Sequence, residues 1–431
     1  MTRTLPSRRT MLGLAALAAA LAILALALSY RPAIAVITPP PASAFAPQQI
    51  KRGAVLAKLG DCAVCHTSDG GRPLAGARPL ATPFGTLYSD NITPDAETGI
   101  GRWSAAAFRR AMRQGVSRSG AHLYPALPYE HFTHVTDADL DALYAFLMTR
   151  RPVRQPAPEN ALYFPLGFRP LLAGWKMLFP REAPFRPDPA RSAAWNRGAY
   201  IVQGLGHCGG CHTPRNMAGG EERGRALAGG VAEGWRAPPL DASNPAARRW
   251  TVDALETYLS TGLSPDHSAA GGPMKAVVES LSQVPRGEVR AIATYIAATM
   301  GNAAAPARAE RPIDEPARAA RDFPQGAVLF AGACAGCHGG GAPMLGQGRP
   351  ALGLATNLRD PDPTSAIQAV LRGIEPPVAR RGPLMPAFAD GLTDAQIAAA
   401  LSYARARFTD QPAWRGLGRT VAKARKESAE P

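Results

Sequence analysis

Three stretches of this chain repeat one pattern of apolar and polar positions. Each stretch begins with a short apolar segment that carries a glycine near its start: Gly53, Gly198 and Gly326. Each ends with a longer segment of helical apolar spacing, over residues 137–149, 287–300 and 394–408. A tyrosine lies in each of these last segments: Tyr144, Tyr295 and Tyr403. The repetition predicts three related helical units, in which a small residue on the first helix lets the last helix cross it closely.

Residues typical of helix ends support these units. Two of the last helices have a threonine N-cap that is followed by Asp: Thr136 and Thr393. A middle helix is predicted from Trp103 to Gly115 and again from Trp250 to Gly262, and the interval is the same in both cases. The middle helix of the third stretch ends at Gly373. We expect the three glycines to be helix C-caps.

All six cysteines lie in three copies of one motif, C-x-x-C-H. The copies pair Cys62 with Cys65, Cys208 with Cys211 and Cys334 with Cys337, and the histidines that follow are His66, His212 and His338. This motif is the attachment signature of c-type haem, whose vinyl groups react with the two thiols while the histidine faces the iron. A disulfide scaffold would not place a histidine after every second cysteine, and a zinc site would not need three identical copies. The sequence therefore predicts three covalently bound haem c groups with these histidines as axial ligands.

The glycine register also predicts second axial ligands. Met274 lies as far beyond Gly262 as Gly262 lies beyond Trp250, and Met385 lies equally far beyond Gly373. Both methionines lie in loops rich in Pro and Gly, and Met is the usual second ligand in a cytochrome of this kind. We expect His/Met ligation of the second and third haems.

The first haem departs from this pattern, because the matching position beyond Gly115 is Leu127, which has no lone pair to give to iron. Three alternatives are open: a loop histidine takes the place of the methionine, the iron is five-coordinate, or Met112 reaches in from the preceding helix. The histidines that flank the position are His122, His131 and His134. Of these, we favour His131 as the sixth ligand.

An apolar run from Met11 to Ser29 follows Arg3, Arg8 and Arg9. It predicts a secretory signal, and its length of about 19 residues also fits an uncleaved membrane anchor; both place the body outside the cytoplasm. The expected organisation is a signal or anchor with a Pro-rich linker (1–46), haem domains (47–150, 191–301 and 321–409), a Pro- and aromatic-rich strap (151–190), a flexible linker (302–320) and a loose basic tail (410–431). The strap is expected to pack across a domain seam or to present an apolar patch around Trp175 and Phe179 to a partner or membrane.

The formal charge is +15, from 42 Arg and 6 Lys against 33 acidic residues. Such a charge suits docking to an acidic partner or an anionic membrane surface. A general enrichment in Arg and Ala is the simpler explanation. No segment resembles a nucleic-acid-binding module.

With three haem motifs, the chain resembles the triple-haem cytochrome c subunits of membrane-bound bacterial dehydrogenases, such as those of alcohol and gluconate dehydrogenases. The resemblance covers about residues 52–414 and includes the stretches LYPALPY, DALYAFL, GPMKAV and MPAF. In that family the position of Leu127 is commonly Met. The stretches PYEHFT, FPLGFRPLLAGWKMLF and RFTDQPAW resemble the branch that accompanies molybdenum hydroxylases acting on aldehydes or N-heterocycles.

The resemblance implies an all-α fold of three tandem class I cytochrome c domains. It also implies a relay: a catalytic quinoprotein, flavoprotein or molybdenum hydroxylase oxidises a substrate, and this chain passes the electrons to membrane quinone or a terminal oxidase on the periplasmic side of the inner membrane. The residues agree, because the sequence contains no nucleophile constellation and no second cofactor motif. One rival function is a peroxidase-like haem enzyme at a Met-less first haem. A haem-based sensor is a second rival, although no output domain is visible.

Overall fold

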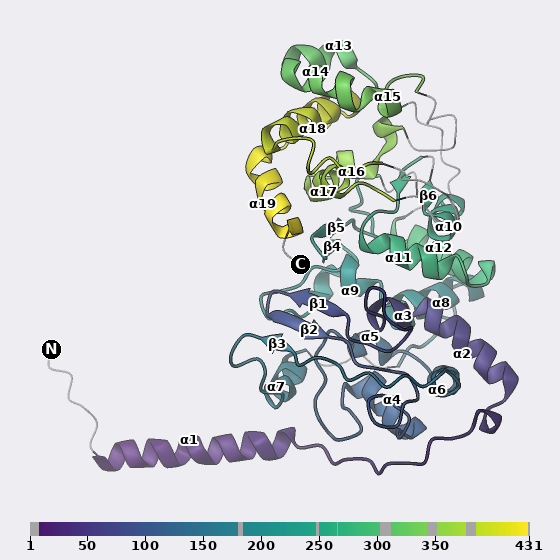
Figure 1. Ribbon diagram of the computed structural model, residues 1–431, viewed down its shortest axis with the longest axis vertical. Helices are drawn as coiled ribbons and strands as arrows, with labels where there is room; N and C mark the ends of the chain where they lie inside the picture. The colour runs from purple at the N-terminus through teal and green to yellow at the C-terminus, as the bar shows by residue number, and fades with distance from the viewer. Residues whose placement is uncertain are drawn as a thin grey trace. The chain divides into compact units, whose positions relative to one another are not determined.

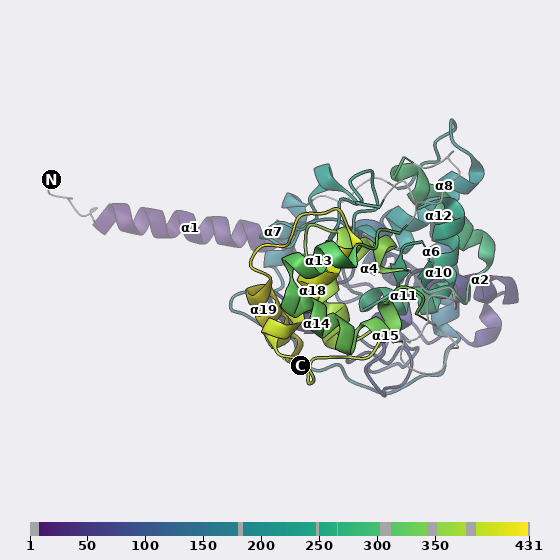
Figure 2. The same cartoon turned by 90° about the horizontal axis from the view of Figure 1, so that it is seen from above.

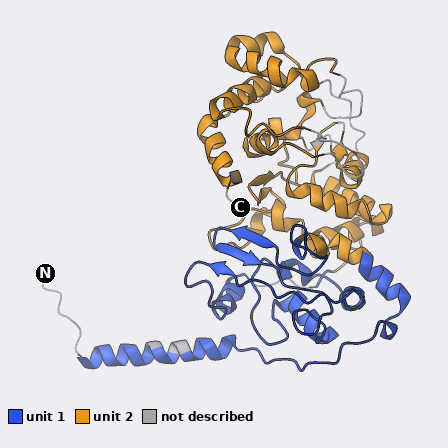
Figure 3. Cartoon of the chain, in the orientation of Figure 1, with its two compact units in different colours: residues 1–54, 65–185 blue, residues 55–64, 186–431 orange. Residues whose placement is uncertain are grey.

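Helices form most of the described chain, and short antiparallel hairpins lie between them (Figure 1). The computed structural model describes residues 8–179, 184–246, 250–264, 266–301, 312–342, 351–375 and 385–429. The chain divides into two compact units (Figure 3). Unit 1 comprises Met1–Ala54 and Cys65–Phe185, and unit 2 comprises Val55–Val64 and Arg186–Pro431. The second and third sequence repeats therefore belong to one unit.

Unit 1 contains the N-terminal helix and most of the first repeat. Its helices are α1 Arg8–Ser29, α4 Ala105–Gln114, α5 Tyr129–Phe132, α6 Asp137–Met148 and α7 Leu171–Leu178, and the division between the units falls within α2 Pro47–Leu59 and α3 Cys62–Cys65. A small antiparallel sheet has the order β1-β2-β3, with bounds β1 Pro79–Thr82, β2 Gly85–Tyr88 and β3 Ala161–Leu162. Thr136 is the N-cap of α6, since its side chain accepts a hydrogen bond from the Asp139 backbone, as predicted.

Unit 2 contains the second repeat and then the third. The second repeat has α8 Ala193–Tyr200, α9 Gly209–His212, β4 Gly230–Ala232, β5 Trp235–Ala237, α10 Val252–Thr261, β6 Leu263–Ser264, β7 Ser268–Ala269, α11 Pro273–Leu281 and α12 Arg286–Thr299. The third has α13 Pro316–Asp322, α14 Pro324–Ala333, α15 Ala335–His338, α16 Thr356–Arg359, α17 Thr364–Arg372, α18 Asp394–Phe408 and α19 Leu417–Ala429. Thr393 forms a complete capping box with Gln396 at the start of α18.

The glycine of each first helix lies directly under a backbone carbonyl of the last helix. A Cβ at Gly53, Gly198 or Gly326 would overlap the carbonyl oxygen of Ala142, Ala291 or Ala399, respectively. The same Cβ would lie 2.7–2.8 Å from the Cβ of the aromatic residue four positions later. These close crossings confirm the predicted role of the small residue in all three repeats.

The aromatic residues at the crossings correct one part of the match between repeats. They are Phe146, Tyr295 and Tyr403, so Phe146 and not Tyr144 corresponds to the other two tyrosines. Tyr144 lies two positions earlier, and its hydroxyl donates to the carbonyl oxygen of Trp103 at 2.7 Å. The repeats were matched by residue type. At the crossing, however, the aromatic residue must lie four positions after the alanine whose carbonyl meets the glycine.

Three connecting segments are more regular than their composition predicted. Part of the strap forms β3, which pairs with β2, and part forms α7. Residues 302–311 of the expected linker lie outside the described residues, but Pro316–Asp322 is helical, and Ala319 is fully buried there. The C-terminal segment forms α19 and buries Leu417, Val421 and Ala424. Their i, i+4, i+7 spacing gives α19 an apolar face, which its many basic residues concealed in the sequence.

In the part of the chain that the structure describes, no helix is both long enough and apolar enough to cross a membrane.

The helix crossing of the second repeat predicts the effect of one added methyl group. Gly198→Ala would place a Cβ against the rigid carbonyl of Ala291, and overpacking of this kind costs about 1–3 kcal/mol. We expect a lower free energy of unfolding for the holoprotein, measured by circular dichroism in guanidinium chloride.

Gly287→Ala on α12 is the matched control. A Cβ at Gly287 would meet no atom within 4 Å, and alanine is the better helix former by about 1 kcal/mol. Equal stabilities of the two variants would contradict the close crossing.

Candidate haem sites

The three C-x-x-C-H motifs lie on short helical turns of the same kind. The first is α3 itself, and the others are α9 and α15, each preceded directly by the first cysteine of its motif. In every motif the first cysteine is half-buried and the second is exposed, and none of the six cysteines, all described, is in a disulfide. One turn of backbone thus presents both thiols and brings the histidine to its end, as covalent haem attachment requires.

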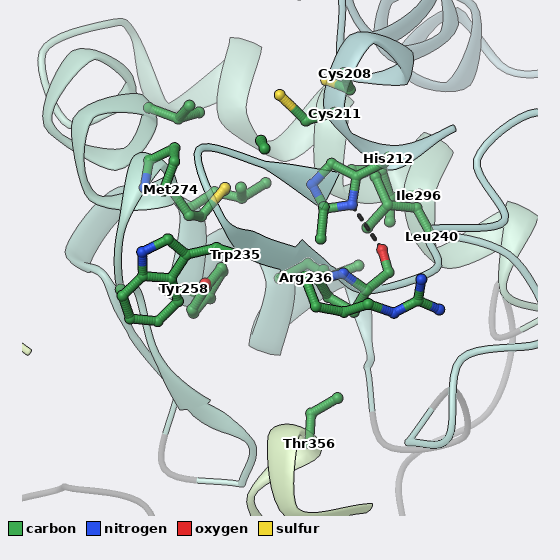
Figure 4. Close-up of a pocket in the computed structure, with 18 of the residues that line it drawn as sticks. Cys208, Cys211, His212, Trp235, Arg236, Leu240, Tyr258, Met274, Ile296 and Thr356 are labelled. Carbon is green, nitrogen blue, oxygen red and sulfur yellow. Dashed lines mark hydrogen bonds between the residues drawn. The ribbon is translucent and has the colours of Figure 1, made fainter. Parts of the chain in front are cut away.

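A cavity of ≈ 240 Å³ in unit 2 contains the second motif. Cys208, Cys211 and His212 line one side, and Met274, near the start of α11, lies opposite His212 (Figure 4). Most of the remaining wall is apolar and includes Trp235. An apolar slot with two thiols, an imidazole and a thioether fits a c-type haem with His and Met on its two faces.

The tautomer of two motif histidines is fixed by backbone carbonyls. His212 Nδ1 donates to the Pro238 oxygen at 2.6 Å, and His66 Nδ1 donates to the Asp90 oxygen at 2.6 Å. Both carbonyls lie just beyond a hairpin, after β5 and β2 respectively. This arrangement leaves the Nε2 lone pair available, which is the usual arrangement for a metal-ligating histidine.

Burial also favours the neutral form of these imidazoles. Loss of solvent lowers the pKa of His66, of His212 and of His338 below the usual histidine value. A neutral ring is the form that binds a metal ion. The first two histidines therefore have both the protonation state and the orientation of an axial ligand.

A second cavity, of ≈ 160 Å³, brings together Cys334, His338 and Met385 of the third repeat. It shares wall residues with the cavity of the second motif: Ala269, Asn357, Ala369 and Ile374. The two cavities therefore lie next to each other in unit 2. Hydrogen bonds join the two repeats there: Ser365 Oγ donates to the Arg236 oxygen at 2.9 Å, and Gln368 Nε2 donates to the Gly234 oxygen at 3.2 Å.

The start of the first motif also belongs to the wall of the second motif's cavity. Asp61, directly before Cys62, lines that cavity, and burial raises the pKa of its carboxyl group to about 6. Gly60 lies against Leu205, and His207 Nε2 is 3.4 Å from the Gly60 oxygen. The segments that precede the first two motifs therefore pack against each other inside unit 2.

Comparison with known proteins agrees with this geometry. The family model described as "Cytochrome c" matches residues 50–151, and that of "Cytochrome C oxidase, cbb3-type, subunit III" matches residues 321–403. The chain is 38% identical to the gluconate 2-dehydrogenase cytochrome c subunit of Pantoea cypripedii, over 88% of this chain and 90% of that one. This chain belongs to the cytochrome c subunits of membrane-bound dehydrogenases.

Other relatives of this cytochrome c subunit are named as subunits of different dehydrogenases. It is 36% identical to the fructose dehydrogenase cytochrome subunit of Gluconobacter japonicus, over 86% of this chain and 81% of that one. It is 48% identical to a nicotinate dehydrogenase subunit of Pseudomonas putida over 94% of its own length, but it spans only 34% of that protein. Its three motifs are haem c attachment sites in cytochrome c domains, and it is an electron-transfer subunit.

The segments that lead from the middle helix to the predicted second-ligand position of this cytochrome c subunit are alike in the first two repeats. Met274 itself is the second residue of α11 and not, as expected, in a loop. The three glycines are the C-caps of α4, α10 and α17, as predicted, and all have positive φ angles: 57° at Gly115, 76° at Gly262 and 72° at Gly373. The Gly115 oxygen accepts from the Leu123 N–H at 2.7 Å, and the Gly262 oxygen accepts from the Ala270 N–H at 2.8 Å.

Because these two loops close at the same spacing from their glycines, Leu127 occupies the loop register of Met274. In the third repeat Met385 itself pairs with Ile374. The methionine of the third repeat thus has the same spacing from its glycine but takes part in a different backbone pairing.

The histidines near Leu127 have different environments. His122 is buried, its Nε2 donates to the Ser29 oxygen at 2.8 Å, and its Nδ1 lies 3.2 Å from Lys176 Nζ. Both of its ring nitrogens are thus engaged with protein groups. His131 lies half-buried on α5, and His134 follows α5 and is buried. Met112 is buried on the preceding helix α4, where the sequence placed it.

The first and second repeats share a further element that was not predicted, a Leu-Ala-Gly triplet after the haem motif. Leu74 and Leu227 have φ angles of 64° and 63°, and each donates its N–H to the hydroxyl of the threonine after the motif histidine, at 3.1 and 3.0 Å. The triplet glycines, Gly76 and Gly229, then donate to the carbonyl oxygen of that histidine at 2.8 Å. The identical letters LAG, a short distance after each of these two haem motifs, are the signal that was available.

Replacing the threonine of this element tests its contribution. Thr213 is 3% exposed, and Thr213→Val would leave the Leu227 N–H without its acceptor inside the protein, at a cost of about 1–3 kcal/mol. We expect a lower melting temperature of the holoprotein, measured by far-ultraviolet circular dichroism.

Thr294→Val is a matched control, since the Thr294 hydroxyl donates to the Arg290 carbonyl of its own helix at 2.8 Å. A loss of stability as large as that of Thr213→Val would argue against the threonine as the support of the haem-binding turn.

Proposed function

We propose that this subunit takes electrons from a catalytic subunit that oxidises an N-heterocyclic acid of the nicotinate type. The observation that carries the proposal is the 48% identity, over 94% of this chain, to the nicotinate dehydrogenase subunit of Pseudomonas putida. The gluconate and fructose dehydrogenase relatives are 38% and 36% identical over slightly less of the chain. The stretches that resemble the branch with molybdenum hydroxylases point the same way, so the proposed partner is a molybdenum hydroxylase.

The second haem is the proposed middle carrier of the relay. When bound, each haem supplies a one-electron carrier, and the protein sets the distances between the carriers. Asp61, next to the first motif, lines the cavity of the second, and Ala369 and Ile374 line the cavities of both the second and the third. These contacts support a path that runs through the second site, with membrane quinone or a terminal oxidase on the periplasmic side of the inner membrane as the acceptor.

The proposed axial ligand sets follow from the cavity walls. Each of the two cavities has a motif histidine and a methionine in its lining, which supports His212 with Met274 and His338 with Met385. For the first haem we propose His66, with His131 as the sixth ligand because His122 already uses both ring nitrogens. A site filled on both faces favours electron transfer over bond chemistry.

Substrate-driven reduction tests the proposed partner. The subunit is purified with its catalytic partner from native membranes, and haem absorbance is followed without oxygen after addition of nicotinate. We expect reduction of the haems that dithionite reduces, and no reduction by gluconate, fructose or ethanol.

Reduction by gluconate, fructose or ethanol in place of nicotinate would overturn the assignment. Turnover of hydrogen peroxide by the isolated subunit would instead support the rival haem enzyme at the first site.

Carbon monoxide tests the axial ligands. Met274→Leu, Met385→Leu and His131→Ala should each open one reduced haem to carbon monoxide, because each removes a donor atom from the iron. The measurement is the carbon monoxide difference spectrum of the reduced holoprotein.

Met217→Leu is the control, since the Met217 side chain is 99% exposed, and it should behave like the unaltered protein. Binding of carbon monoxide to one haem of the unaltered protein would contradict His131 and indicate a five-coordinate first haem.

A further inference from the structure

The exposed large apolar side chains of the described residues gather in two segments of unit 1. One segment is α1 and the residues just after it; the other is residues 163–178, which we call the apolar strap. The strap contributes Tyr163, Phe164, Leu166, Phe168, Leu171, Met177 and Leu178, with exposed fractions from 36% to 97%. Elsewhere in the described chain only Met217, Val231 and Val328 are comparable, and these are scattered. A contiguous apolar patch on a protein surface is typical of a binding face.

The strap is held firmly although its apolar side chains are exposed. Tyr163 donates its N–H to the Phe84 oxygen at 3.1 Å, which continues the pairing of β3. Tyr124 donates its hydroxyl to the Leu166 oxygen at 3.1 Å, and Arg169 donates to the His122 oxygen at 2.8 Å while it stacks over the Tyr124 ring. The exposed side chains are therefore presented on a fixed backbone.

The exposed apolar patch does not include Trp175, around which the sequence predicted it. The Trp175 ring contacts Tyr129 edge-on at 6.4 Å and Phe179 at 4.8 Å, so it belongs to the packing side of α7. Met177 and Leu178 of the same helix are 78% and 75% exposed. The helix α7 thus packs one face on the domain and exposes an apolar face.

The C-terminal end of α1 lies beside the strap (Figures 1 and 2). The Ser29 oxygen accepts from His122 Nε2, and His122 Nδ1 accepts from Lys176 of α7. Every side chain described between Arg8 and Leu28 of α1 is exposed, and most are apolar. The two apolar segments are therefore joined at one end of unit 1.

The charges of these segments have one sign. Residues 163–178 include Arg169 and Lys176 and no acidic residue, and α1 begins with Arg8 and Arg9 and also has none. Apolar and aromatic side chains with a fringe of cations match the boundary between acyl chains and anionic headgroups. Two adjacent apolar segments, the strap and α1, suit an extended bilayer surface, whereas a protein partner could bind to the strap alone.

We propose that unit 1 docks on the surface of an anionic phospholipid bilayer through the apolar strap. Phe164, Phe168, Met177 and Leu178 enter the headgroup boundary, and the contact continues the apolar surface of α1. This contact rests on the proposed position at a membrane but not on the identity of the substrate.

A fluorescent reporter tests the contact in the full-length holoprotein. The haems occupy all six native thiols, so Phe164→Cys or Leu178→Cys provides a single free thiol for the polarity-sensitive dye nitrobenzoxadiazole. With vesicles of phosphatidylethanolamine and phosphatidylglycerol we expect a blue shift of the emission and loss of quenching by aqueous iodide. The same dye at Met217→Cys or Val328→Cys should change in neither respect.

Water-like emission from both strap positions on vesicles that have bound the protein would overturn the proposal, since α1 alone would then carry the attachment. Protection of the dye by the purified catalytic subunit, but not by vesicles, would also overturn it and assign the strap to a protein partner. Equal shifts on phosphatidylcholine vesicles would contradict the role of the cations. In each case reduction of the haems by substrate remains a separate measurement.

Discussion

The contact between a glycine of the first helix and a backbone carbonyl of the last helix is the constraint on which each repeat depends. It lets α2 and α6, α8 and α12, and α14 and α18 approach until their backbones meet. The haem motif begins soon after α2 and α14, and in the second repeat a π-helix, Ile201–Leu205, lies between α8 and the motif. An aromatic side chain one turn beyond the carbonyl completes the crossing in all three repeats.

Beyond the helix crossing, the groups that surround each haem motif come from elements that are distant in sequence. In the first two repeats the motif histidine is oriented by a carbonyl beyond the following hairpin, as His66 with Asp90 and His212 with Pro238 show. The opposing side of the second motif's cavity comes from α11, and part of its wall comes from the third repeat. Residues of both the second and the third repeat therefore line the second site.

The sequence predicted those features that depend on local spacing. The motif turns, the threonine caps of α6 and α18 and the glycine ends of the middle helices are local, and they are confirmed. The shared wall at Ala369 and Ile374 was not predictable, because it depends on how two repeats pack. The buried face of α19 was missed because three apolar residues lie among basic ones, and Tyr144 was mismatched because residue type was weighed above spacing.

The first repeat differs from the others in what fastens its ligand loop. A methionine that binds iron, as proposed for Met274 and Met385, would also anchor the segment that carries it, and Leu127 has no donor atom for such a bond. In this repeat α7 supplies contacts at the same loop: Trp175 packs on Tyr129, two residues after Leu127, and Lys176 donates to the Gln114 and Gly115 oxygens at the end of α4. Since α7 belongs to the apolar strap, the loop with the altered ligand is coupled mechanically to the surface proposed to meet the bilayer. The departure from methionine and the exposed strap are therefore two properties of one packed region.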